Sequence, residues 1–190
     1  MTHTPMTIEE LKRMAGIIRC DIIEMICTAG AGHPGGSLSA TDVVTALYFR
    51  LMRIDPRNPG WPDRDRFILS KGHACPTLYA ALARRGFFSP EVLPSLRSLG
   101  SILQGHPVMQ KTPGVDSTSG SLGNGLSIGL GMALAALVKP LVDGIGLCYG
   151  DVDADGIEAH PSLATSTTAV LIDPSGERSF AHHVGAPHAL

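Results

Sequence analysis

The stretch DRFILSKGHACPTLYA, residues 65–80, decides the predicted fold. Residues 66–70 have the apolar character of a short buried strand, and residues 71–73 end it. Pro76 then favours the first turn of a helix. In parallel α/β sheets the loops beyond the carboxyl ends of the strands line the ligand crevice, because helix N-termini with unpaired N–H groups meet there. The pattern therefore predicts an α/β protein with His73 at the ligand-binding edge of its sheet.

The chain before this stretch predicts two helices. Thr7 and Glu10 form a T-x-x-E capping box, and apolar residues then recur at helical spacing, which predicts an amphipathic helix of about five turns. This helix is expected to stop at the glycines of residues 29–36, which continue as a loop. Ser39 and Asp42 offer a second cap, so we expect a second helix after them.

The chain after this stretch predicts a long helix and a strand. Residues 120–125, GSLGNG, are a glycine loop that leads into a helix rich in Gly and Ala, which reaches Pro140. Small residues allow close backbone packing, so we expect this helix to be central. Residues 144–149, GIGLCY, are expected to form another buried strand, with Asp151 just beyond its end.

The last forty or so residues differ in character from the rest. Residues 165–172 and 177–183 are rich in strand formers, and the DPSG between them suits a type I turn, which predicts a C-terminal β-hairpin. Only Arg178, of the fifteen Lys and Arg residues, lies beyond Lys139. We therefore expect a boundary near residue 150, which divides the chain into residues 1–151 and 152–190.

Composition excludes several classes of partner. The net charge is −2 and the sequence pI is near 6.4, so no basic field favours nucleic acid or an anionic membrane. The N-terminus has no secretory pattern, and the apolar residues 126–138 are too few to span a bilayer, so a cytoplasmic address is expected. Four cysteines without a CxxC pair predict neither a zinc site nor a disulfide framework.

Three of the eight histidines lie in loops rich in glycine and proline, namely His33, His73 and His106. Glycine lets a backbone approach a ligand closely, and an imidazole near neutral pH can donate, accept or carry charge. Each histidine taken alone is more often an ordinary loop residue than a catalytic one. The glycine loop 120–125 alone is equally ambiguous, since it fits neither the dinucleotide-binding nor the P-loop pattern. The three histidines together favour a site.

Four successive segments resemble the thiamine-diphosphate domain of the transketolase family. They are GHPGGSLSATDVVTALYF, DRFILSKGHACPTLYA, GSILQGHP and PGVDSTSGSLGNGLSIGLGMALA. The resemblance covers about residues 8–151. It implies a doubly wound α/β fold with a mostly parallel sheet, truncated here. It also implies transfer of a two-carbon ketol unit between sugar phosphates, with thiamine diphosphate and Mg²⁺ (or Ca²⁺) as cofactors.

The resemblance also implies roles for residues that match the family's motifs. His33 and His106 would face the hydroxyls of the ketose donor, and His73 would lie between the cofactor diphosphate and the reacting carbon. Backbone groups of the glycine loop would touch the aminopyrimidine. The implied catalytic residues are His33, His73 and His106, the implied cofactor-binding residues are His73, Gly120, Ser121, Leu122 and Asp151, and the implied metal ligand is Asp151.

The sequence departs from the family at its metal and pyrimidine sites. Family members continue after Gly-Asp as GDG and place an asparagine further on, whereas Val152 and Asp153 follow Asp151 here, and residues 152–190 contain no asparagine. The domain that holds the pyrimidine, with its activating glutamate, is also missing. We therefore expect a homodimer or a separate transketolase C-terminal subunit to complete the site.

Residues 152–190 instead resemble a segment of the ribokinase-like (PfkB) sugar kinases. The segment lacks the GxGD-type stretch that carries the anion hole and the catalytic base of those kinases, so kinase activity does not follow. Two alternatives to a transketolase stay open: a non-catalytic truncated or fused fragment with a vestigial site and, less favoured, a sugar kinase.

Overall fold

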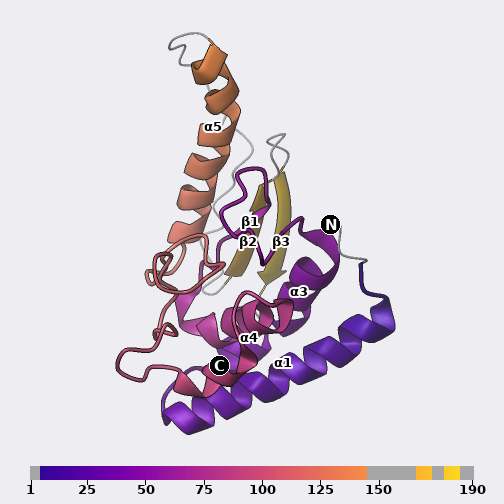
Figure 1. Ribbon diagram of the computed structural model, residues 1–190, viewed down its shortest axis with the longest axis vertical. Coiled ribbons are helices and arrows are strands. Elements are labelled where there is room, and N and C mark those ends of the chain that lie inside the picture. Colours follow the sequence, from indigo (N-terminus) through magenta and orange to yellow (C-terminus); the bar gives the residue numbers. More distant parts are fainter. Residues whose placement is uncertain (1–4, 145–165, 173–177, 185–190) are drawn as a thin grey trace.

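The computed structural model describes residues 5–144, 166–172 and 178–184. Helices dominate these residues (Figure 1). The elements in chain order are α1 (Ile8–Ala29), α2 (Pro34–Leu38), α3 (Thr41–Ala46), the π-helix η1 (Leu47–Leu51), β1 (Arg66–Phe67), the 3₁₀ helix η2 (Gly72–Ala74), α4 (Cys75–Arg85), the 3₁₀ helix η3 (Pro90–Ser95), α5 (Asn124–Gly144), β2 (Ser166–Ile172) and β3 (Arg178–Val184).

The first helix, α1, forms as its sequence predicts. The Thr7 hydroxyl accepts a hydrogen bond from the Glu10 backbone N–H, and the Glu10 carboxylate accepts one from the Thr7 N–H at 2.7 Å, which completes the capping box. Gly30 ends the helix in a left-handed conformation with φ of 62°. A residue without a Cβ adopts this conformation at little cost. The predicted five-turn helix and its cap are confirmed.

Helix α4 occupies the centre of the core. Every residue from Cys75 to Ala83 is buried, and α1 packs across this helix through Ile18, Ile22 and Met25. An ion pair joins the two helices, because the Arg84 guanidinium donates to both carboxylate oxygens of Asp21, at 2.6 and 2.8 Å. The buried helix at the centre of the core is therefore the one that directly follows His73.

Helix α5 differs from its predicted central position. Figure 1 shows that it leaves the main body and projects away from it. Among the described residues with assigned burial, it contributes a small second cluster, in which Leu126 and Met132 pack against the buried Ala133. Small side chains permit close packing but bury little apolar area. The prediction that this helix is central is wrong for the described part of the chain.

The segment expected to be a loop before the second helix is itself helical. Pro34 begins α2, where its fixed φ suits the first turn. The predicted cap of Ser39 and Asp42 does not form. The Ser39 hydroxyl donates to the Gly36 carbonyl at 3.1 Å, and the Asp42 carboxylate accepts from Arg19 at 2.7 Å. These two side chains are therefore occupied elsewhere, and α3 begins without a side-chain cap.

The described strands form an antiparallel sheet in the order β1-β2-β3, with Arg66 opposite Ile172 and Ser166 opposite Val184. The mostly parallel sheet expected from the sequence is not what these strands form. One physical reason is the short connection between β2 and β3, residues 173–177, because parallel neighbours need a crossover of about a dozen or more residues. The expected strand at 145–149 and the hairpin turn at 173–176 lie outside the described residues.

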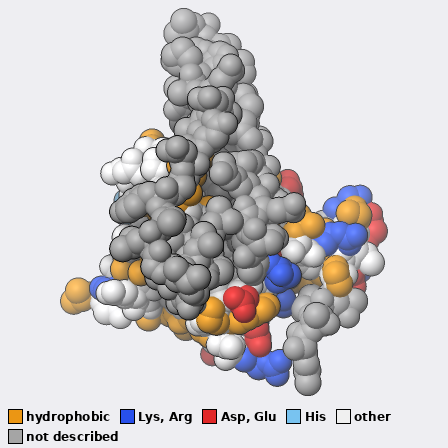
Figure 2. All heavy atoms as spheres, turned by 90° about the horizontal axis from the view of Figure 1, so that it is seen from above, with side chains coloured by type: hydrophobic (Ala, Val, Ile, Leu, Met, Phe, Trp, Pro, Cys, Tyr) orange, Lys and Arg blue, Asp and Glu red, His pale blue; other side chains and the backbone are white. Residues whose placement is uncertain are grey.

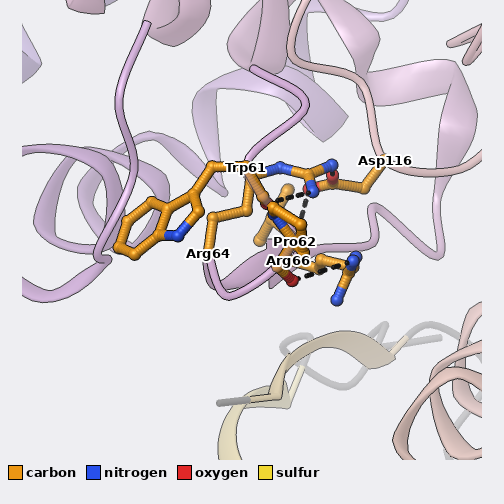
Figure 3. Close-up of polar contacts among 6 residues, drawn as sticks. Trp61, Pro62, Arg64, Arg66 and Asp116 are labelled. Carbon is orange, nitrogen blue, oxygen red and sulfur yellow. Dashed lines mark hydrogen bonds and ion pairs between the residues drawn. The ribbon is translucent and has the colours of Figure 1, made fainter. Parts of the chain in front are cut away.

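A buried carboxylate fixes the turn that precedes β1. Asp116 accepts a hydrogen bond from Arg64, and the same guanidinium donates to the Trp61 carbonyl at 3.1 Å (Figure 3). Arg66 donates to the Pro62 carbonyl at 3.3 Å. Only 4% of the Asp116 side chain and 16% of the Arg64 side chain are exposed. The residues 61–67 are thereby held against the loop that leads to the glycine turn at 120.

The surface of the described residues carries both signs of charge. Figure 2 shows Lys and Arg side chains interspersed with Asp and Glu side chains and with apolar ones on the face that it views. Among the helices that the structure describes, none has the length and apolar character needed to cross a membrane.

Candidate functional site

Two of the predicted site histidines lie against each other. His33 is the N-cap residue of α2 and is exposed, whereas His73 lies in η2 and is half-buried. Their ring centroids are 5.1 Å apart with an interplanar angle of 70°, an edge-on contact. Gly36 makes this approach possible, since a Cβ at that position would lie 3.2 Å from the His73 Nε2 atom. The glycine thus lets the α2 backbone approach the His73 ring.

Lys71 links α2 to the segment that carries His73. Its Nζ atom donates to the Gly36 carbonyl at 2.7 Å and to the Ser39 hydroxyl at 2.9 Å. Partial burial lowers the pKa of Lys71 from its ordinary value. Two hydrogen bonds from one ammonium group hold α2 against the segment that carries His73. No sequence pattern assigned this lysine to the site, although its LSKGHA context was the available signal.

His106 brings the third loop to the same place. It is exposed, and the segment beside it reaches the His73 loop at Ser119, whose carbonyl oxygen would lie 2.7 Å from a Cβ at Gly72. A Cβ at Gly120 would lie 4.0 Å from the His106 Cδ2 atom, so the glycine turn runs beside this ring. The Ser119 N–H donates to the Pro107 carbonyl at 3.2 Å and joins the two loops. The structure therefore brings His33, His73, His106 and Gly120 together.

The remaining predicted site residues lie in an exposed turn or outside the described residues. Ser121 and Leu122 lie in the exposed turn before α5, and Leu122 is 59% exposed. The turn is anchored at its far end, where the Gly125 N–H donates to the Ser70 hydroxyl at 3.2 Å. Asp151 lies outside the described residues. Within the described ranges, no group of three or more His, Cys, Asp and Glu side chains could hold a metal ion.

The electrostatics of the cluster favour a neutral His73. Burial lowers the pKa of His73, and the positive charges of His33, Lys71 and His106 lower it further, in that order. A neutral imidazole has one nitrogen that donates and one that accepts, so it can both hydrogen-bond a ligand and take a proton from it. The arrangement can therefore bind an oxygen-rich ligand and move a proton at one ring.

We expect His73 to titrate below the ordinary histidine value of 6.5. Because the folded chain favours the neutral ring, the stability that His73 contributes is present above 6.5 and is lost as the pH falls through the lowered pKa. A ¹H–¹³C NMR titration of the histidine Cε1 resonances measures this, with His73→Asn to assign the peak. A midpoint above 6.5 would contradict the electrostatic description.

We expect Gly72→Ala to destabilise the chain and disturb the site. A Cβ at Gly72 would lie 2.7 Å from the Ser119 carbonyl oxygen and 2.8 Å from its carbonyl carbon, so backbone would have to move. Overpacking of this kind costs about 1–3 kcal/mol. Denaturant unfolding measures the loss.

The matched control for this substitution is Gly16→Ala on α1. A Cβ at Gly16 meets no heavy atom within 4 Å. Alanine in a helix interior is more favourable than glycine by about 1 kcal/mol, so the same chemical change is expected to stabilise the protein there. Equal effects at the two positions would show that the 72–119 contact is not tight.

The family comparisons agree with this geometry. Residues 10–141 match the model of the family described as "Transketolase, thiamine diphosphate binding domain". The chain is 51% identical over 146 residues to the 6-deoxy-6-sulfo-D-fructose transketolase subunit SqwG of Clostridium sp. (strain MSTE9), which covers 77% of this chain and 53% of that protein. It is 47% identical over 131 residues to an apulose-4-phosphate transketolase subunit of Phocaeicola vulgatus, with 69% and 46% covered.

Solved structures give the same result. A transketolase variant from Pichia stipitis has a TM-score of 0.65 at 36% identity and covers 70% of this chain and 20% of its own. Transketolase from Leishmania mexicana has the same TM-score at 33% identity. The chain thus spans about half of the curated subunits that it matches and about a fifth of the solved chains. The family match ends at residue 141, and these comparisons give no support to the sugar-kinase resemblance of residues 152–190.

Proposed function

The chain belongs to the transketolase thiamine-diphosphate-binding domain family, and on this premise we propose that it is the diphosphate-binding part of an enzyme that transfers two-carbon ketol units between sugar phosphates. The observation that carries the proposal is the meeting of three histidine loops beside a glycine turn. His33 and His73 are in ring contact, and Gly120 runs beside His106. Transfer of a ketol unit needs such proton-handling groups around one ligand.

The described residues fit thiamine diphosphate on the protein side. The glycine turn opens α5, and its residues Gly120, Ser121 and Leu122 are exposed, so their backbone groups are available to the aminopyrimidine. Gly123 adopts φ of 84°, so this turn needs a residue without a Cβ. When bound, thiamine diphosphate supplies the electron sink for a carbanion. The binding of Mg²⁺ or Ca²⁺ through Asp151 stays a prediction, because that residue lies outside the described part.

The three histidines would have separate tasks in this enzyme. His73, neutral and half-buried, would donate a hydrogen bond and accept a proton close to the reacting atoms. His33 and His106 are exposed, so they are accessible to the hydroxyl groups of a sugar. Imidazole side chains suit this work because they exchange protons near neutral pH.

A second chain would complete the enzyme. Two of the relatives are named as subunits of transketolases, and the chain spans about half of each. We propose association with a separate chain that holds the pyrimidine end of the cofactor, or with a second copy of this chain that contributes to a shared site. The ketose donor and the aldose acceptor would both be sugar phosphates.

Reconstitution tests the proposal. The chain is mixed with a candidate pyrimidine-binding subunit encoded beside it, and the transfer of a ketol unit from a ketose phosphate to an aldose phosphate is measured. We expect transfer only when both chains, thiamine diphosphate and Mg²⁺ are present. A stable complex of the two chains that binds the cofactor but transfers no ketol unit would reject the proposed activity.

A further inference from the structure

Two side chains of α4 donate hydrogen bonds to three consecutive backbone carbonyls of the loop that carries His106. The Tyr79 hydroxyl lies 2.8 Å from the Gln104 carbonyl oxygen and 3.1 Å from that of His106 itself, so its single hydrogen is shared between them. The Cys75 Sγ atom donates to the intervening Gly105 carbonyl at 3.2 Å. These donors stand one helical turn apart on the same helix, and they match the spacing of the three carbonyls.

Both donors are fully enclosed in the core. Tyr79 is 0% exposed and Cys75 is 2% exposed. Burial raises the pKa of Cys75 to about 12, so the thiol stays protonated and remains a donor at any physiological pH. Burial also raises the pKa of Tyr79 above its ordinary value. A buried hydroxyl that lost its acceptors would lose hydrogen bonding that no water replaces, so the loop is held closely to the helix.

The opposite side of the same loop is also confined. The Arg97 guanidinium packs against the loop, since a Cβ at Gly105 would come within 3.1 Å of it. Arg97 has a positive φ of 63°, and its N–H donates to the Leu103 carbonyl at 2.9 Å. The loop thus lies between the buried helix α4 and the Arg97 side chain.

The helix that holds His106 is also the helix that begins directly after His73. His73 lies in η2, and α4 starts two residues later at Cys75 without a break. One rigid, buried element therefore determines where both rings lie. We propose that Tyr79, assisted by Cys75, is a positioning residue that sets the place of the His106 imidazole relative to His73. The inference rests on the proposed function for its catalytic consequence, but not for its geometry.

The test uses Tyr79→Phe, with Tyr48→Phe as the matched control. Tyr48 is a buried tyrosine that stacks edge-on with Phe67 and makes no side-chain hydrogen bond to either histidine loop in the described part of the chain. Both variants lose one hydroxyl from the core. The first readout is the ¹H–¹³C NMR resonance of the His106 Cε1 atom in the full chain. We expect this resonance to shift in Tyr79→Phe and to stay in place in Tyr48→Phe.

A second variant covers a failure of Tyr79→Phe to fold. Cys75→Ala removes the other donor and leaves the phenol in place, and it is expected to move the same His106 resonance by a smaller amount. An unchanged His106 resonance in a folded Tyr79→Phe chain, or an equal shift in Tyr48→Phe, would overturn the proposal.

The second readout is the reconstituted enzyme. We expect Tyr79→Phe to lower kcat/KM for the ketose donor by about tenfold, because a misplaced ring costs rate without being removed. Tyr48→Phe is expected to stay within about twofold of the wild type, as is usual for a change remote from the reacting atoms. Wild-type chains that transfer no ketol unit would reject the proposed function, and the NMR result would still decide the positioning. A shifted His106 resonance with unchanged kcat/KM would overturn the role in catalysis.

Discussion

Replacing Asp116 by alanine is expected to lower the free energy of unfolding by about 3–5 kcal/mol, the cost of breaking a buried ion pair by removing one partner. The substitution would leave the Arg64 guanidinium, 16% exposed, without its carboxylate. It would also leave the buried Phe67 N–H without an acceptor. Urea unfolding followed by circular dichroism measures the loss.

The pKa of Asp116 reflects the cost of burying its carboxylate. Burial raises this pKa, while the Phe67 N–H and then the Arg64 charge act in the opposite direction. Desolvation of the carboxylate therefore opposes the attraction of its partners. Removing one member is costly because the other stays buried and unpaired.

The control for this substitution is Glu9→Ala. Glu9 pairs with Lys12 at 2.9 Å, but the two side chains are 74% and 69% exposed. Exposed pairs of this kind contribute little, so the free energy of unfolding is expected to stay close to that of the wild type. Comparable losses in Asp116→Ala and Glu9→Ala would contradict the part assigned to the buried carboxylate.

Replacing His73 by alanine is expected to reduce kcat of the reconstituted enzyme by a factor of about 100 to 1000, the usual effect of removing one preorganised donor at a reacting centre. His73 is the member of the cluster in contact with His33 and under the electrostatic influence of Lys71 and His106. The assay is ketol transfer by the two-chain mixture at saturating cofactor.

The matched control is His182→Ala on β3, outside the three histidine loops. It makes the same chemical change, and kcat is expected to stay near the wild-type value. The fold of His73→Ala is checked by its unfolding midpoint. A folded His73→Ala chain with undiminished kcat would remove His73 from the site.

The helices near the N-terminus were predictable because their signals are local. The capping box of Thr7 and Glu10 and the left-handed Gly30 lie within a few residues of the ends of α1. The same local reading was wrong for Ser39, because its hydroxyl is used by the carbonyl of Gly36. A hydroxyl that could cap a helix can instead donate to a backbone carbonyl, and only the folded chain shows which of the two contacts forms.

The sheet was less predictable because strand pairing depends on distant residues. Residues 66–70 have strand character, but only Arg66 and Phe67 pair in a strand, opposite Ile172 and Leu171 of β2. These partners come from a strand near the C-terminus, which no local pattern around residue 66 identifies. The position of α5 likewise depends on which surfaces cover it, and a pattern of small residues does not specify them.

The sequence indicated the histidines of the site but not the residues that hold their loops in place. Glycine and proline around each histidine indicated His33, His73 and His106, and the structure places these loops together. Lys71 and Tyr79 were missed because their roles come from contacts with carbonyls 25 to 35 residues away. Such contacts have no periodicity or motif of their own. The catalytic roles of the histidines stay predictions.

We propose that the three histidine loops form one binding site for thiamine diphosphate. An NMR titration of the full chain, with ¹³C-labelled histidine, against thiamine diphosphate in the presence of Mg²⁺ tests this directly. The resonances of His33, His73 and His106 are expected to move together and to saturate at one common ligand concentration. Resonances that stay still at millimolar cofactor, or that move independently of one another, would contradict it.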